Sequence, residues 1–77
     1  MTDQNDHEID AVGLLCPLPV LKARKALLTM PAGAVLRLVA SDPAAVIDVP
    51  HFCAEAGHDF MSFEDSGDVQ VYLIRRG

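Results

Sequence analysis

The chain passes from its first expected strand to its first expected helix through the stretch Gly13-Leu14-Leu15-Cys16-Pro17-Leu18-Pro19. We expect a short strand at residues 8–12 before it. Residues 20–30 after it predict a helix, because they are rich in Leu, Ala, Lys and Arg. A residue that precedes proline avoids the helical conformation. We therefore predict extended backbone at Cys16 and Leu18, with the helix starting at about Pro19 and Leu18 as its cap.

The middle of the chain predicts a strand followed by a broken helix. Residues 34–40 form an apolar run with one interruption, which predicts a strand. Ser41-Asp42-Pro43 is a helix-start signal, with a capping side chain before a first-turn proline. Because an interior proline breaks or kinks a helix, Pro50 predicts a short helical piece at 43–47 and a second helix at about 48–56.

The last third of the chain predicts a β-hairpin. Gly57 ends the second helix, and strands at 60–64 and 69–74 are joined by a turn at 65–68. The element order is therefore β-α-β-α-β-β, and two helices can cover only one face of a four-stranded sheet. We predict an α+β fold, a two-layer α/β sandwich with a mixed sheet, whose first β-α-β unit is parallel and right-handed.

Length and composition limit the class of protein. The chain has 77 residues and 51% hydrophobic residues, enough for one core. We expect one domain at residues 8–77 and disorder in the polar residues 1–7. With 11 acidic against 6 basic residues, it lacks the basic surface that direct nucleic-acid binding requires. Its first residues show no basic n-region and no apolar h-region, and no apolar run reaches the ~20 residues that a membrane span needs, so we expect neither a signal peptide nor a membrane span. We expect a cytoplasmic monomer that binds proteins and no membrane.

Cys16 is the main candidate for chemistry. A helix N-terminus carries partial positive charge and stabilises a thiolate, so we expect an exposed thiol with a lowered pKa. Pro17 and Pro19 stiffen the backbone around it, and Gly13 permits a backbone turn beside it. A buried structural cysteine is the alternative, since free cysteines are often buried. The strand–Cys-Pro-x-Pro–helix context favours the reactive thiol.

The same residues carry a family resemblance. The blocks are residues 10–20, Arg24-Lys25, Asp42-Pro43, Pro50-His51-Phe52-Cys53 and Tyr72-Leu73-Ile74-Arg75. Together they resemble the TusA/SirA family of sulfur carriers over residues 8–77. Leu15 departs from the family pattern, since many members carry a charged or polar residue there.

The resemblance implies a fold like that of the C-terminal domain of a bacterial translation initiation factor. It also implies that Cys16 accepts sulfur as a persulfide from a cysteine desulfurase or rhodanese and passes it to an acceptor protein. Known routes of the family lead to tRNA 2-thiouridine, the molybdenum cofactor and sulfur oxidation. The resemblance points to no cofactor.

The first expected helix carries a basic patch. Arg24 falls inside the apolar arc of the helical wheel, whereas Lys22 and Lys25 lie on its polar side. Arg24 could extend from the edge of the core with its charge in water. Alternatively, Arg24 and Lys25 dock a partner or stabilise the Cys16 anion, and the family resemblance favours this second interpretation.

The other cysteine and the histidines receive structural interpretations. We expect Cys53 to be a packed core thiol, with a resolving cysteine for Cys16 as the alternative. His51, Cys53 and His58 lack the tight ligand pairs typical of zinc sites, so we predict no metal. Asp10 could end its strand or pair with a base. Two other functions stay open beside sulfur transfer: a thiol–disulfide redox protein and a regulatory interaction module.

Overall fold

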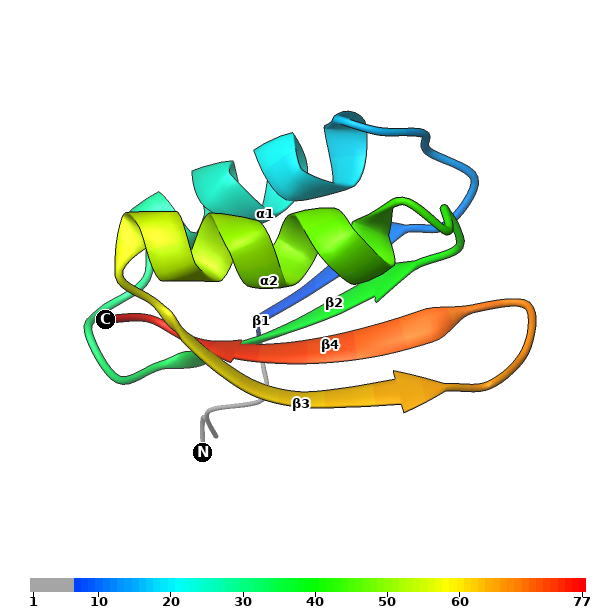
Figure 1. Cartoon of the computed structure of the whole chain (residues 1–77). Coiled ribbons are helices and arrows are strands. Elements are labelled where there is room, and N and C mark those ends of the chain that lie inside the picture. The colour runs from blue at the N-terminus through cyan, green and yellow to red at the C-terminus, as the bar shows by residue number, and fades with distance from the viewer. Residues whose placement is uncertain (1–6) are drawn as a thin grey trace.

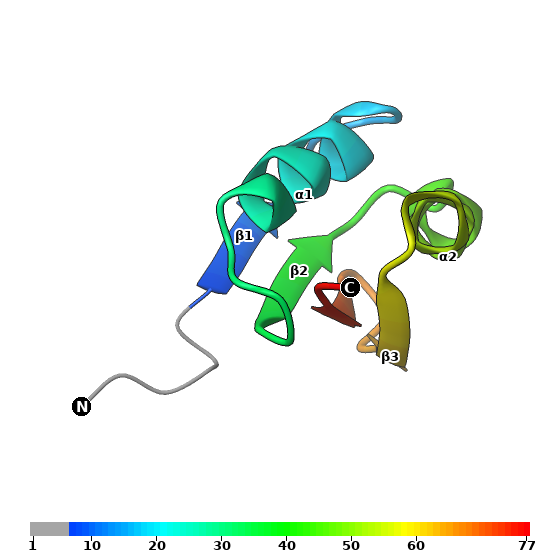
Figure 2. The same ribbon diagram turned by 90° about the vertical axis from the view of Figure 1, so that its left-hand side faces the viewer.

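The computed structural model describes residues 7–77, which form a four-stranded sheet with two helices on one face (Figure 1). The elements in chain order are β1 (His7–Ala11), α1 (Leu18–Leu28), β2 (Val35–Ala40), α2 (Ala45–Ala56), β3 (Asp59–Asp65) and β4 (Gln70–Arg75). The end-on view of Figure 2 shows the two layers. The predicted fold class and element order are confirmed. Disorder was predicted for residues 1–7. Residues 1–6 lie outside the described range, and His7 is the first residue of β1.

The sheet is mixed, as predicted, and its strands lie in the order β1-β2-β4-β3. β1 runs parallel to β2, and Ala11 lies opposite Ala40 at the end of both strands. The other two pairings are antiparallel, and an irregularity between Phe60 and Ser62 shifts the register of β3. Since β1 and β2 end together, the segments that follow them meet at one edge of the molecule.

The core lies between the sheet and the helices. Alternate residues of β2 and β4 face the helices and are buried, as the period of two along a strand requires. Each fully buried aliphatic side chain stabilises the fold by roughly 1.5–3 kcal/mol. The largest fully buried side chains are Tyr72, Leu27, Leu36, Leu38, Ile74, Val49, Pro19 and Cys53. They anchor α1 and α2 and so fix the ends of the helices near Cys16.

Pro50 does not break the second helix, so that prediction is wrong. α2 continues through Pro50, while Pro43 and Ala44 form a turn before it. A proline inside a helix removes one backbone hydrogen bond. The buried face that includes Val49 and Cys53 holds the helix on the sheet on both sides of Pro50. Burial of this face outweighs the lost hydrogen bond.

The first helix begins one residue earlier than predicted. Leu18 is already helical, and Pro17 is the cap residue. The N–H of Leu18 donates to the carbonyl oxygen of Leu15 at 2.8 Å, and the N–H of Leu21 donates to that of Pro17 at 3.1 Å. Pro19 fits the first turn, where a backbone N–H would lack a helical partner, and its ring is buried. These contacts override the pre-proline preference at Leu18.

Candidate functional site

Cys16 lies in the loop between β1 and α1 and is exposed. Its backbone N–H donates to Oδ2 of Asp42, which follows β2, and the Cys16–Pro17 peptide bond is cis. Beside it, the N–H of Gly13 donates to Oγ of Ser41 at 2.8 Å. Gly13 has a φ of 85°, a conformation that favours glycine. The loops after the parallel strands β1 and β2 are therefore tied together beneath the thiol.

Asp42 is the buried polar group that holds this arrangement. It is 8% exposed, and its Oδ1 also accepts the N–H of Ala44 at 3.1 Å. Hydrogen bonds between N–H groups and a carboxylate satisfy the buried charge. The sequence predicted Asp42 only as part of a helix start, yet it also positions the backbone of Cys16. The Asp42-Pro43 block of the family resemblance was the available signal.

The thiol of Cys16 has a carboxylate partner that the sequence did not reveal. Its Sγ donates to Oδ2 of Asp48, 32 residues away in the sequence, at 2.8 Å. This hydrogen bond, followed by partial desolvation and then by the negative charges of Asp48 and Asp42, raises the pKa of Cys16 above its ordinary value.

The lowered pKa predicted for Cys16 is therefore wrong. Its basis was the positive end of the helix, but Cys16 lies outside α1, which begins at Leu18, and Pro17 and Pro19 have no N–H to offer. A carboxylate in direct contact favours the neutral thiol. The two aspartates thus outweigh the helix terminus.

A groove between the helices opens beside the thiol. It has a volume of about 340 Å³ and is lined by Cys16, Pro17, Val20, Asp48, His51, Phe52 and Glu55. His51 Nε2 lies 3.7 Å from Glu55 Oε2, so a protonated His51 would pair with that carboxylate. The groove gives a partner access to Cys16 from the α2 side.

Three leucines that lie close to Cys16 in the sequence are exposed. Leu15 is 68% exposed, and Leu18 and Leu21 are each 47% exposed. Exposed apolar side chains gathered at one place are typical of surfaces that bind other proteins. The sequence showed Leu15 as a departure from the family pattern but did not show that these three leucines are exposed.

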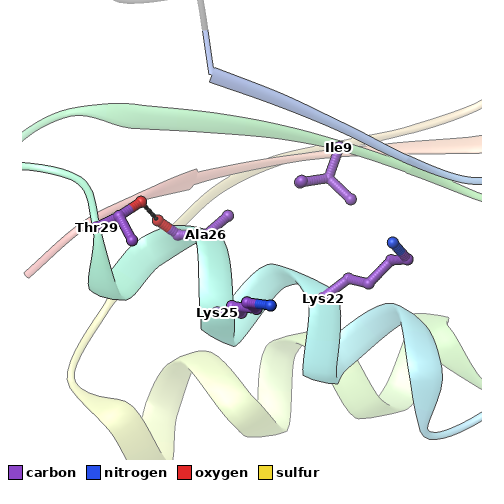
Figure 3. Close-up of a pocket in the computed structure, with 5 residues that line it drawn as sticks. All are labelled: Ile9, Lys22, Lys25, Ala26 and Thr29. Carbon is purple, nitrogen blue, oxygen red and sulfur yellow. Dashed lines mark hydrogen bonds between the residues drawn. The ribbon is translucent and has the colours of Figure 1, made fainter.

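The predicted basic residues Arg24 and Lys25 are both exposed on α1. Among residues 7–77, neither makes an ion pair. Lys25 lines a shallow groove of about 280 Å³ with Lys22, Ile9, Ala26 and Thr29, on the side of α1 that faces β1 (Figure 3). The structure thus places Lys25 outside the groove that contains Cys16.

Cys53 lies in the core and is 1% exposed. Burial raises the pKa of its thiol to about 11.

Within the described chain, no group of three or more His, Cys, Asp and Glu side chains is arranged to hold a metal ion. In the same residues, neither helix is long and apolar enough to cross a membrane.

Comparison with known proteins agrees with this geometry. The family described as sulfurtransferase TusA matches residues 7–76. The crystal structure of a SirA-like protein from Desulfitobacterium hafniense is 28% identical to this chain, with a TM-score of 0.78. The match covers 91% of this chain and 96% of that protein. With nearly every described residue inside the family match, the chain belongs to the TusA family of sulfurtransferases.

Proposed function

We propose that this protein carries sulfur as a persulfide on Cys16. The observation that carries the proposal is the exposed thiol, fixed by the hydrogen bond from its backbone to Asp42. A carrier thiol must reach two partners in turn, which requires an accessible sulfur at a fixed position. The groove and the exposed leucines provide contact surface without a deep pocket.

The transfer step needs no external oxidant. The Cys16 sulfur attacks the terminal sulfur of a donor persulfide, so a bond forms between these two sulfur atoms and the S–S bond of the donor breaks. The donor sulfur leaves as a thiolate and takes up the proton that Cys16 loses. Passing the sulfur to an acceptor repeats this exchange with Cys16 as the leaving group. Each step conserves electrons.

The partners follow from this chemistry and from the family. The donor is a cysteine desulfurase or a rhodanese, both of which present a persulfide, and the acceptor is a downstream sulfur-transfer protein. We propose that the sulfur serves tRNA 2-thiouridine synthesis or related sulfur trafficking, with the protein acting as a cytoplasmic monomer. Arg24 and Lys25 form part of the surface that docks the donor, and Gly13, Pro17 and Pro19 shape the loop of Cys16.

The redox alternative has less support. A thiol–disulfide enzyme needs a second accessible thiol near the first, and Cys53 is buried in the core. The regulatory alternative would leave the exposed thiol without a role.

Sulfur loading tests the proposal directly. The protein is incubated with a cysteine desulfurase and free cysteine, and its intact mass is recorded. We expect the wild type and Cys53→Ala to gain one sulfur atom that a reductant removes. We expect Cys16→Ser to gain none while its circular dichroism spectrum stays native. Loading of Cys16→Ser, or no loading of the wild type, would refute the proposal.

A further inference from the structure

The Asp48 carboxylate lies against the reactive sulfur. It lies in the first turn of α2, and the next residue, Val49, is fully buried against the core. Its Oδ2 accepts the hydrogen bond from the Cys16 thiol at 2.8 Å. A helix packed on the core therefore places this carboxylate beside the sulfur.

The charges around the sulfur are mainly negative. Asp48 contacts it directly, and the charge of Asp42 also acts on it. His51 and Glu55 line the same groove and lie 3.7 Å apart, so the positive charge of a protonated His51 is directed to Glu55. Lys22 and Lys25 line the separate groove beside Ile9 (Figure 3). No lysine or arginine of residues 7–77 lines the groove of Cys16 to offset its carboxylates.

The Asp48 carboxylate has opposite effects on the empty form of Cys16, a thiol, and on its loaded form, a persulfide. An empty Cys16 carries a hydrogen on Sγ and donates it to Asp48. A loaded Cys16 has no hydrogen on Sγ, so this hydrogen bond is lost. The terminal sulfhydryl of a persulfide is more acidic than a thiol and is an anion at neutral pH. A carboxylate nearby disfavours that anion, as like charges in one site do.

We propose that Asp48 sets how readily Cys16 gives up its sulfur, because its carboxylate stabilises the empty thiol and repels the loaded persulfide. This inference rests on the proposed carrier function and adds a residue to it. A carrier that bound sulfur too tightly would not release it. By destabilising the loaded form, Asp48 shifts the equilibrium toward transfer of the sulfur to the next acceptor. Asp48 thus contacts the reacting sulfur atom and acts on the equilibrium between its loaded and empty forms.

An exchange with a small persulfide measures this balance without any protein partner. Glutathione persulfide transfers its terminal sulfur to Cys16. A bond forms between that sulfur and Sγ, the S–S bond of the glutathione persulfide breaks, and the proton of the Cys16 thiol ends on glutathione. At a fixed ratio of glutathione persulfide to glutathione, intact mass after alkylation gives the loaded fraction of the protein. We expect Asp48→Asn to raise the loaded-to-empty ratio about tenfold at neutral pH, the effect of one unit of pKa shift from a neighbouring charge.

Matched variants separate the possible outcomes. Glu64→Gln removes an exposed carboxylate from β3, outside the groove of Cys16, and we expect its loaded-to-empty ratio to stay within about twofold of the wild type, since its charge is solvated and screened. Asp48→Ala tests the charge if Asp48→Asn does not fold. We expect the difference between wild type and variant to shrink at acidic pH, because protonation of the persulfide removes the negative charge that Asp48 repels.

Equal or lower loading of both Asp48 variants relative to the wild type at neutral pH would overturn the role of Asp48. That result would leave the carrier proposal intact if the wild type still loads from a cysteine desulfurase. Failure of the wild type to load from the desulfurase would instead refute the carrier function, while the exchange with glutathione persulfide would still report on Asp48.

Discussion

The two cysteines of this chain occupy opposite environments. Cys16 stands exposed in a loop with two aspartates around it, whereas Cys53 lies 1% exposed on the buried face of α2. Both thiols have a raised pKa, but the causes differ. A hydrogen bond to Asp48 is the main cause at Cys16, and burial is the cause at Cys53.

This contrast shows that a low pKa does not distinguish the two thiols. Access does, because Cys16 can meet a partner in the folded protein and Cys53 can react only when the core opens. The pKa of Cys16 is under the control of a neighbour that can be exchanged by mutation, whereas that of Cys53 is a property of the core.

The largest expected difference is the rate of thiol alkylation. A core thiol becomes accessible in only about 10⁻³ to 10⁻⁶ of molecules at a time. We therefore expect iodoacetamide to modify Cys16 at least about a thousandfold faster than Cys53 in the native protein. Peptide mass spectrometry against time gives both rates.

Unfolded protein in urea serves as the control for that comparison, and there the two rates should converge. In the native protein, the alkylation rate at Cys16 should keep rising as the pH is raised beyond the ordinary pKa of a thiol, because Asp48 raises the pKa of Cys16. Comparable native rates at the two cysteines would show that Cys53 is not protected by the core.

Serine substitutions should separate the two sites by stability. Cys53→Ser places a hydroxyl without a defined partner in the core, and we expect a loss of about 1–3 kcal/mol in the free energy of unfolding. Cys16→Ser lies on the surface, and its urea midpoint should match the wild type. If both variants unfold at the same midpoint, the packing assigned to Cys53 is wrong.

The fold was largely readable from the sequence because its signals are local. Apolar strands, helix-forming residues and the glycine after α2 gave the element order and the two layers. The errors arose where tertiary contacts override local preference. Pro50 stays helical because Val49 and Cys53 pack on the core, and Leu18 is helical because the loop hydrogen bonds and buried Pro19 favour it.

The site was readable only in part. Cys16 could be found from its motif and its family resemblance, whereas Asp48 could not be assigned to it. The carboxylate reaches the thiol only because the packing of α1 and α2 on one sheet brings residues 32 positions apart into contact. The sign of the pKa shift at Cys16 was missed for this reason. A helix terminus is visible in the sequence, but a carboxylate from another helix is not.

Charge reversal on α1 tests whether the surface near Cys16 also selects its partner. We expect Arg24→Glu combined with Lys25→Glu to weaken binding to a cysteine desulfurase about tenfold at low salt, where surface charge acts most strongly. The measurement is affinity by calorimetry at two salt concentrations.

The control for that experiment is Arg37→Glu combined with Arg75→Glu, which changes net charge equally on strands β2 and β4. These arginines pair at the surface with Glu8 and Asp59, and such exposed pairs contribute little to stability. If both double variants weaken binding equally, net charge and not the α1 surface governs the encounter.

The smallest expected effect is the dependence of stability on alkaline pH. Burial raises the pKa of Cys53 in the folded protein from 9.0 to about 11, so the folded state retains a proton that the unfolded state loses. The stabilisation that this difference provides is fully present below pH 9 and is lost as pH rises toward 11. Tyr72 also has a pKa raised by burial, and Cys16 has a raised pKa, so both contribute in the same direction. We therefore expect the free energy of unfolding of Cys53→Ala to fall less steeply than that of the wild type between about pH 8 and about pH 10.5, with a residual slope from the other two groups. Urea unfolding across this range measures both slopes. Identical slopes would show that Cys53 does not retain its proton on folding, and the contrast between the two thiols would then rest on access alone.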